Sequence, residues 1–131
     1  MTQVHRLNIP PCPKPRMTKA DRWRKRQSVL KFFAFRDAVR QAGKHKKQYA
    51  LDSKILEYDS FDIVFHVPMP KSWSKKKKGY MNGSAQQQRP DLDNYLKAWK
   101  DSVYEEDAIV WRVKASKLWT DGTGHIVVNY L

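Results

Sequence analysis

The stretch Arg89-Pro90-Asp91-Leu92-Asp93-Asn94-Tyr95-Leu96-Lys97 combines the signals of a helix start with two carboxylates one residue apart. Pro90 resists helical continuation from upstream and keeps the residue before it out of the helical region. Asp is common at the beginning of a helix, where its side chain accepts hydrogen bonds from free backbone N–H groups. The stretch therefore predicts a helix that begins at Asp91 or Asp93 and runs to about Val103.

The carboxylates of this expected helix have two possible roles. Asp93, Lys97 and Asp101 would lie on one face, because they follow one another at steps of four residues. In the first interpretation, Asp91 or Asp93 caps the helix and Lys97 is only an ion-pair partner. In the second, Asp91 and Asp93 form half of a metal site, since Mg²⁺ binds a few carboxylates and keeps several of its waters. Spacing alone leaves both interpretations open.

The acidic stretch interrupts a strongly basic chain. The 131 residues include 26 Lys and Arg against 13 Asp and Glu, a formal net charge of +13. Residues 1–47 hold 14 basic residues and two acids, whereas residues 90–107 hold six acids and two lysines. Basic side chains neutralise phosphates and a local acidic group can hold a cation, so this distribution is typical of a metal-dependent enzyme acting on nucleic acid. The net charge alone fits a non-catalytic DNA- or RNA-binding protein equally well.

The hydrophobic pattern predicts one α+β domain over residues 1–131, with the element order β-α-β-α-β-β. Large apolar residues recur at every second position from Phe61 to Val67, which indicates a strand with one buried face. Asp121-Gly122-Thr123-Gly124 is typical of a hairpin turn. We expect a mixed sheet covered by two helices, with strands at 4–9, 61–67, 108–118 and 125–130 and helices at 28–42 and 91–103.

Two basic segments lie within this domain, a proline-rich arm at 10–27 and a loop at 71–89. Both place a tryptophan among lysines and arginines, so they can follow a phosphate backbone while an aromatic ring stacks on a base. The loop is longer than most connections, and we expect it to become ordered on substrate. The alternatives are a solvated linker and a solubilising loop. The predicted DNA contacts are Lys14, Arg16, Lys19, Arg22, Trp23, Arg24, Lys71, Trp73, Lys75, Lys76, Lys77, Lys78 and Arg89.

Several other classes are disfavoured by the sequence. Cys12 is the single cysteine, so an intramolecular disulfide and a cysteine zinc cluster are excluded, and the four histidines have no metal-binding spacing. No apolar run approaches the roughly 20 residues of a membrane span, and the first residues lack the apolar segment of a signal peptide. We therefore expect a cytoplasmic protein that uses neither a membrane nor a small-molecule substrate.

The segment from Arg89 to Ala98 resembles the signature of the RusA-type Holliday-junction resolvases, a group common in phages and prophages. The resemblance continues through Asp101 and into Glu106-Asp107-Ala108-Ile109-Val110, which is similar to the second acidic motif of that family. Upstream, residues 9–16 and the Trp73-Ser74-Lys75 segment are also similar to the family. The likeness runs through nearly the whole chain.

This resemblance implies a homodimeric, Mg²⁺-dependent endonuclease, with Mn²⁺ as a substitute ion, that resolves four-way DNA junctions by symmetric nicks in recombination and repair. The family's catalytic acids and metal ligands correspond to Asp91, Asp93 and Asp107, and its essential lysine corresponds to Lys97. Two residues depart from the family pattern: Glu106 stands where Asp is usual, and Ile109 stands where Gln is usual.

The chemistry of these residue types agrees with that implication. Three carboxylates can bind one or two ions that polarise a phosphoryl oxygen and lower the pKa of an attacking water. A lysine near the scissile phosphate supplies a compact positive charge. A two-fold dimer would present two equivalent sites to the two equivalent strands of a junction. A nuclease that cuts flaps or forks would use the same acids, and a non-catalytic DNA-binding protein would explain the charge but not the acidic cluster.

Overall fold

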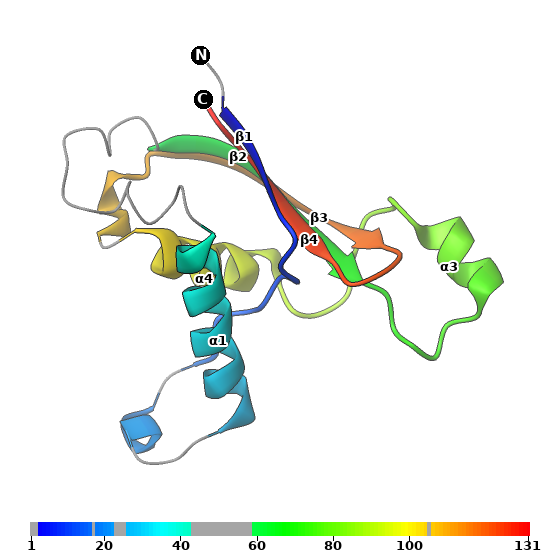
Figure 1. Ribbon diagram of the computed structural model, residues 1–131, viewed down its shortest axis with the longest axis horizontal. Helices are drawn as coiled ribbons and strands as arrows, with labels where there is room; N and C mark the ends of the chain where they lie inside the picture. The colour runs from blue at the N-terminus through cyan, green and yellow to red at the C-terminus, as the bar shows by residue number, and fades with distance from the viewer. Residues whose placement is uncertain (1–2, 17, 23–25, 43–58, 105) are drawn as a thin grey trace.

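A mixed sheet organises the part of the chain that the computed structural model describes, namely residues 3–16, 18–22, 26–42, 59–104 and 106–131. Within these residues the sheet has four strands in the order β1-β4-β2-β3 (Figure 1). β4 is antiparallel to both of its neighbours, whereas β3 is parallel to β2. The strands are β1 Gln3–Leu7, β2 Ser60–Pro68, β3 Arg112–Thr120 and β4 His125–Tyr130.

Two longer helices lie on one side of this sheet (Figure 1). They are α1, Gln27–Gln41, and α4, Leu92–Val103. Among the described residues there are also a shorter helix, α3, at Lys75–Met81 and two 3₁₀ helices, η1 at Lys19–Arg22 and η3 at Asp107–Ile109. No described helix is both long and apolar enough to cross a bilayer.

The core lies between the sheet and these two helices. Burial alternates along β2, so that Phe61, Ile63 and Phe65 are buried while Asp62 and Val64 between them are partly exposed. Phe65 stacks on Tyr95 of α4 with ring centroids 5.5 Å apart, and Phe61 stacks on Tyr104 at 6.3 Å. Each fully buried side chain of this kind contributes about 1.5–3 kcal/mol relative to an exposed one. The predicted α+β class, with a mixed sheet and two helices over it, is confirmed.

The crossover between the parallel strands β2 and β3 determines where the two ends of α4 lie. A connection between parallel strands must run back along the sheet before the second strand begins. α4 makes this return, so it starts near the end of the sheet where β2 and β3 finish and ends near the point where β3 begins (Figure 1). Its 12 residues span roughly 18 Å. Carboxylates that flank α4 at its two ends are therefore far apart.

Two segments differ from the elements that the sequence predicts. Residues 75–81, expected to belong to a loop, form helix α3 because the Ser74 hydroxyl accepts a hydrogen bond from the Lys77 N–H at 3.2 Å and caps the first turn. The strand expected from residue 108 begins only at Arg112, since Asp107–Ile109 form a 3₁₀ turn. The other boundaries differ by one or two residues, as is usual for helix and strand ends.

A turn is present at residues 121–124, but the predicted hairpin is wrong, because β3 and β4 lie on either side of β2 and do not pair with each other. Gly124 shows why a glycine is needed in this connection. Its φ of +84° is disfavoured for other residues. A Cβ at this position would also lie 2.9 Å from the Cδ of Pro68. The turn thus packs closely on the end of β2.

Candidate active site

The start of α4 carries two carboxylates, one at the N-cap and one in the first turn. Asp91 occupies the N-cap position with an extended backbone, yet its side chain accepts no capping hydrogen bond. Asp93 lies in the first turn, and both residues are exposed. Within the described ranges, neither carboxylate forms an ion pair. Helix capping therefore does not account for either side chain, and both are available to a cation or ligand.

The segment that leads into these acids is held in place by Lys117, near the end of β3. The Lys117 Nζ donates hydrogen bonds to the carbonyl oxygens of Gln88 at 2.6 Å and Pro90 at 2.7 Å. The backbone N–H of the buried Gln86 donates to the Lys117 carbonyl at 3.0 Å, so strand and segment are joined in both directions. Lys117 thus fixes the backbone immediately before Asp91.

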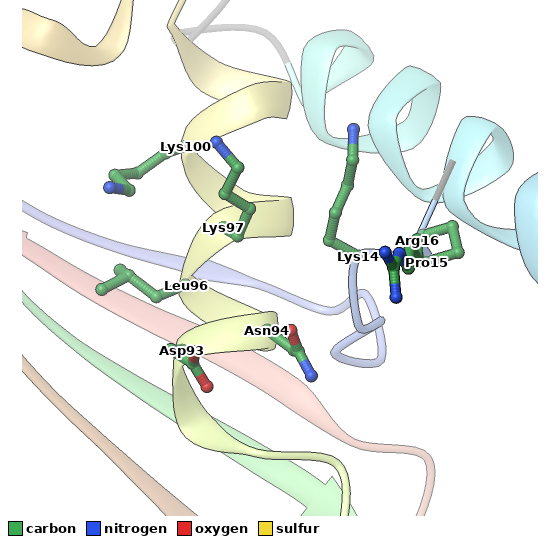
Figure 2. A pocket seen from close by; sticks show the side chains of 8 residues that line it. All are labelled: Lys14, Pro15, Arg16, Asp93, Asn94, Leu96, Lys97 and Lys100. Atoms are coloured by element: carbon green, nitrogen blue, oxygen red, sulfur yellow. The ribbon is translucent and has the colours of Figure 1, made fainter. Parts of the chain in front are cut away.

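A cationic hollow of ≈ 520 Å³ lies between α4 and the proline-rich segment (Figure 2). The backbone N–H of Lys14 donates to the Asn94 carbonyl at 3.1 Å and joins the two walls. Figure 2 shows Lys97 and Lys14 extending in the same direction from facing segments, whereas Asp93 points toward the start of α4. The hollow is cationic, since four cations and one carboxylate line it, although its three lysines also pair with acids outside the lining. The lining residues are Lys14, Pro15, Arg16, Asp93, Asn94, Leu96, Lys97 and Lys100.

Two acids at the other end of α4 are already paired with lysines. Asp101 accepts ion pairs from Lys14 at 3.0 Å and from Lys97 at 3.7 Å. Asp107, in η3 beyond the helix, pairs with Lys100 at 3.8 Å. Asp107 of the second acidic motif is therefore paired locally, and the motif lies away from Asp91 and Asp93.

The predicted three-carboxylate site is not assembled within one chain. Among the residues that the structure describes, no group of three or more His, Cys, Asp and Glu side chains could hold a metal ion. Asp91 and Asp93 share one end of α4 and Asp107 lies beyond the other. The available pair fits a different arrangement, because Mg²⁺ is often held by one or two carboxylates together with substrate phosphates and waters.

Lys97 projects from the same face of α4 as Asp93, and its side chain is 56% exposed. Its carboxylate partner is Asp101, one turn later, rather than Asp93. An exposed ion pair of this kind is weak, typically about 0.3–0.5 kcal/mol, so a phosphate can displace it. Its role at a scissile phosphate stays a prediction.

Three of the predicted DNA contacts make internal contacts, and one of them is Lys77, which lies 4.2 Å from the centre of the Trp73 ring. Lys14 pairs with Asp101 and lies 4.2 Å from the ring centre of Phe32, so it ties the arm to both helices. Trp73 is half-buried against Trp119, with ring centroids 5.0 Å apart. Their DNA contacts stay predictions, as do those of the mostly exposed Arg16, Lys19, Lys71, Lys75, Lys76, Lys77, Lys78 and Arg89. The side chain of Arg22, and Trp23 and Arg24, lie outside the described residues.

Burial keeps the two nearby weak acids protonated. It raises the pKa of Tyr95 to about 12, with a further contribution from Cys12. It also raises the pKa of the Cys12 thiol, although Lys31 acts in the opposite direction. Both groups are therefore protonated near neutral pH.

Two candidate functional residues, Lys117 and Tyr80, were not predicted from the sequence. Lys117 contacts residues 27 and 29 positions earlier, and no local pattern marks such a pairing. Tyr80 lay in a segment expected to be a polar loop, whereas α3 holds it on the surface at 86% exposure. Only the juxtaposition of α3 with the sheet reveals it.

Two comparisons relate this chain to known proteins. The chain is 36% identical over 70 residues to "Uncharacterized protein YqaN" of Bacillus subtilis (strain 168), a match that covers 47% of this chain and 49% of that protein. The chain thus spans about half the length of this curated relative. It also matches, over residues 8–129, the family described as Endodeoxyribonuclease RusA. The chain, which carries Asp91 and Asp93 at the start of α4, therefore belongs to the RusA family of endodeoxyribonucleases.

Proposed function

We propose that this protein is a Mg²⁺-dependent endodeoxyribonuclease that cuts four-way DNA junctions as a homodimer. The observation that carries the proposal is the two exposed carboxylates of Asp91 and Asp93, which have no ion-pair partner among the described residues. They lie beside a cationic hollow in a chain of the RusA family. Cytoplasmic action in recombination and repair is part of the same proposal, and it follows from the substrate.

The residues around the hollow divide the work between binding and chemistry. Asp91 and Asp93 would hold the cation, which supplies Lewis-acid activation of the phosphodiester when bound. Lys97 places a positive charge where the backbone enters, and it exchanges its weak pair with Asp101 for a phosphate oxygen. Arg16 and Lys100 line the same hollow and neutralise neighbouring phosphates.

The position of Asp107 makes the dimer part of this proposal. A third carboxylate is separated from Asp91 and Asp93 by the length of α4. Asp107 of a second copy could supply it, since a two-fold axis can bring opposite ends of two helices together. The proposed catalytic set is thus Asp91, Asp93 and Lys97 of one chain with Asp107 of the other.

Cleavage of a substrate panel tests the activity. Four-way, three-way, flap and linear duplex DNA of shared sequence are incubated with the protein in Mg²⁺, in Mn²⁺ and in EDTA. We expect paired nicks in the four-way junction with Mg²⁺ or Mn²⁺ and intact DNA in EDTA. Preferential cutting of flaps would identify the alternative nuclease specificity. Junction binding without cleavage in either metal would identify a non-catalytic DNA-binding protein.

Mixing two inactive variants tests the sharing of the site between copies. In a mixed dimer of Asp91→Asn and Asp107→Asn chains, a shared arrangement leaves one site with all of its carboxylates. We expect single-strand nicking by the mixture and none by either variant alone. If the mixture is also inactive although mixed dimers form, all the ligands belong to one chain.

A further inference from the structure

Tyr80, on helix α3, has the most exposed side chain among the large hydrophobic residues that the structure describes. It is 86% exposed, compared with 71% for Trp111 and 64% for Val4. Single exposed apolar residues are common and need no explanation by themselves. The setting of Tyr80 is what distinguishes it.

The helix that carries Tyr80 is anchored to the sheet on both sides. Before it, Trp73 packs edge-on against Trp119, and Lys77 lies 4.2 Å from the centre of the Trp73 ring. After it, the Gly83 N–H donates to the Trp119 carbonyl at 2.9 Å, and Asn82 Oδ1 accepts from the Asp121 N–H at 2.9 Å. Tyr80 is thus presented on a held element, which lowers the entropic cost of a contact with a ligand.

The surface around Tyr80 is cationic. Four consecutive lysines, 75–78, form the start of α3, and in the described part of the chain none of them pairs with a carboxylate. Lys76, Lys77 and Ser74 join Tyr80 around an open hollow of ≈ 520 Å³. Unpaired lysines beside an open aromatic face match a nucleic-acid strand, in which phosphates and bases alternate. The lysines alone would suit an acidic protein equally, but the ring favours a base.

The location of α3 connects this surface to the candidate active site. α3 projects from the end of the sheet where β2 ends and β4 begins, and α4 starts toward the same end (Figure 1). The chain leaving α3 runs through Gln88, which Lys117 holds, directly into Asp91. A strand bound along α3 can therefore continue to the two carboxylates.

We propose that Tyr80 stacks on an unstacked base at the branch point of the DNA, so that α3 contributes to the preference for branched over linear DNA. The inference rests on the proposed function and deepens it. Bases within a linear duplex are stacked on their neighbours and offer no free face, whereas a branch point interrupts the stack. The lysines bind the phosphates of any DNA, and Tyr80 distinguishes the branch.

The test compares Tyr80→Ala with Tyr80→Phe, and uses Trp111→Ala as the matched control. Trp111 is also an exposed aromatic residue, but it lies at the opposite end of the sheet, beside the start of β3. Binding is measured without divalent metal on a four-way junction carrying 2-aminopurine at the branch, and on a linear duplex of the same sequence. The fluorescence of 2-aminopurine reports stacking at the labelled base.

We expect Tyr80→Ala to weaken junction binding about 5- to 150-fold, the range for loss of one stacked base, and to change the 2-aminopurine signal. Duplex binding should stay within twofold. Tyr80→Phe, which keeps the ring, should retain junction binding, and Trp111→Ala should behave as the wild type. A Lys75→Gln, Lys76→Gln double variant should weaken both DNAs alike and reduce the salt slope by up to ~0.9 per lost phosphate contact.

Three outcomes overturn the proposal. If Tyr80→Ala binds the junction as tightly as the wild type, Tyr80 does not contact the DNA. If it loses as much affinity for the duplex as for the junction, Tyr80 does not distinguish the two DNAs. A shift from dimer to monomer on sedimentation identifies Tyr80 as a subunit contact instead. Cleavage by the wild type is measured separately. If the wild type does not cut DNA but the 2-aminopurine signal depends on Tyr80, the proposed nuclease activity is refuted and the proposed base stacking still stands.

Discussion

The two ends of helix α4 carry acids in opposite circumstances. At the start, Asp91 and Asp93 are exposed and unpaired within the described ranges, and Lys117 holds only the backbone before them. At the end, Asp101 and Asp107 are partly buried and paired with lysines. The same type of side chain, a carboxylate, thus stabilises the structure at one end of the helix and is available to a ligand at the other. An acid-rich stretch divides into functional and structural parts only when the partners of each carboxylate are known.

The largest expected effect concerns the unpaired end. Asp91→Asn or Asp93→Asn should reduce cleavage by about 10²- to 10⁴-fold, the range contributed by positioned catalytic groups, because each removes a proposed cation ligand. Junction binding should be equal or tighter, since a negative charge that faces phosphates is lost. Single-turnover cleavage and a binding titration measure the two quantities.

Asp121→Asn is the control for this charge change, because Asp121 is an exposed acid in the turn between β3 and β4. It should cut at the wild-type rate. Cleavage by Asp91→Asn close to the wild-type rate in Mg²⁺ would abolish the contrast between the two ends of α4. Asp91 would then be an ordinary surface residue.

Lys97 lies between the two ends of α4, and its role is either catalytic, with Asp91 and Asp93, or structural, with Asp101. If it acts at the scissile phosphate, Lys97→Ala should lower the single-turnover rate about 10²-fold while the protein stays folded and bound to the junction. Its weak pair with Asp101 predicts a loss of only a few tenths of a kcal/mol in the free energy of unfolding.

Lys97→Arg sharpens the same assignment. The planar guanidinium differs in shape and hydration from the ammonium, so this variant should also cut slowly. A thermal melt of both variants checks that the fold is retained. If Lys97→Ala cuts at an undiminished rate, the role of Lys97 is structural, as the ion-pair partner of Asp101.

Lys117 is the tether of the unpaired end. Lys117→Met removes two hydrogen bonds from an ammonium group to the Gln88 and Pro90 carbonyls and should destabilise the protein by about 1–3 kcal/mol. It should also lower cleavage about 10-fold and raise the half-saturating Mg²⁺ concentration, as expected when support for a ligand is lost. The Mg²⁺ titration matters most, because a purely structural role would not change it.

Lys114→Met is the matched control on the same strand, since Lys114 is exposed and lies three residues before Lys117. It should leave both the Mg²⁺ requirement and the melting temperature unchanged. A wild-type Mg²⁺ titration for Lys117→Met would show that the position of Asp91 does not depend on this tether.

The smallest effect is expected at the paired end. Asp101→Asn removes ion pairs with Lys14 and Lys97 and should cost about 1 kcal/mol or less, seen as a fall of about 2–6 °C in melting temperature. Cleavage should stay within twofold of the wild type. A tenfold loss of cleavage in a folded Asp101→Asn variant would instead place Asp101 with the catalytic group.

Local preferences account for what could be predicted. The alternation from Phe61 to Val67 predicted a half-buried strand, and burial along β2 alternates accordingly. Pro90 and the aspartates predicted the start of α4 to within one residue of its observed position, Leu92. Helix α3 was not predicted, because its run of lysines suggested a loop. In the structure, the Ser74 cap and the packing of Trp73 favour a helix there.

The sequence by itself determined the helices and strands with strong periodicity, the presence of a turn at residues 121–124 and the candidate acids, because these depend on backbone preferences and on neighbours within a few residues. It did not determine that this turn crosses the end of β2 instead of closing a hairpin. Only the tertiary structure decided which carboxylates are free. The parallel pairing of β2 with β3 requires α4 to run back along the sheet, and this separates Asp91 from Asp107. It also brings Lys117 to the Pro90 carbonyl, 27 residues away in the chain, and Lys14 to Asp101. Such pairings depend on strand order and helix direction, which no local pattern encodes.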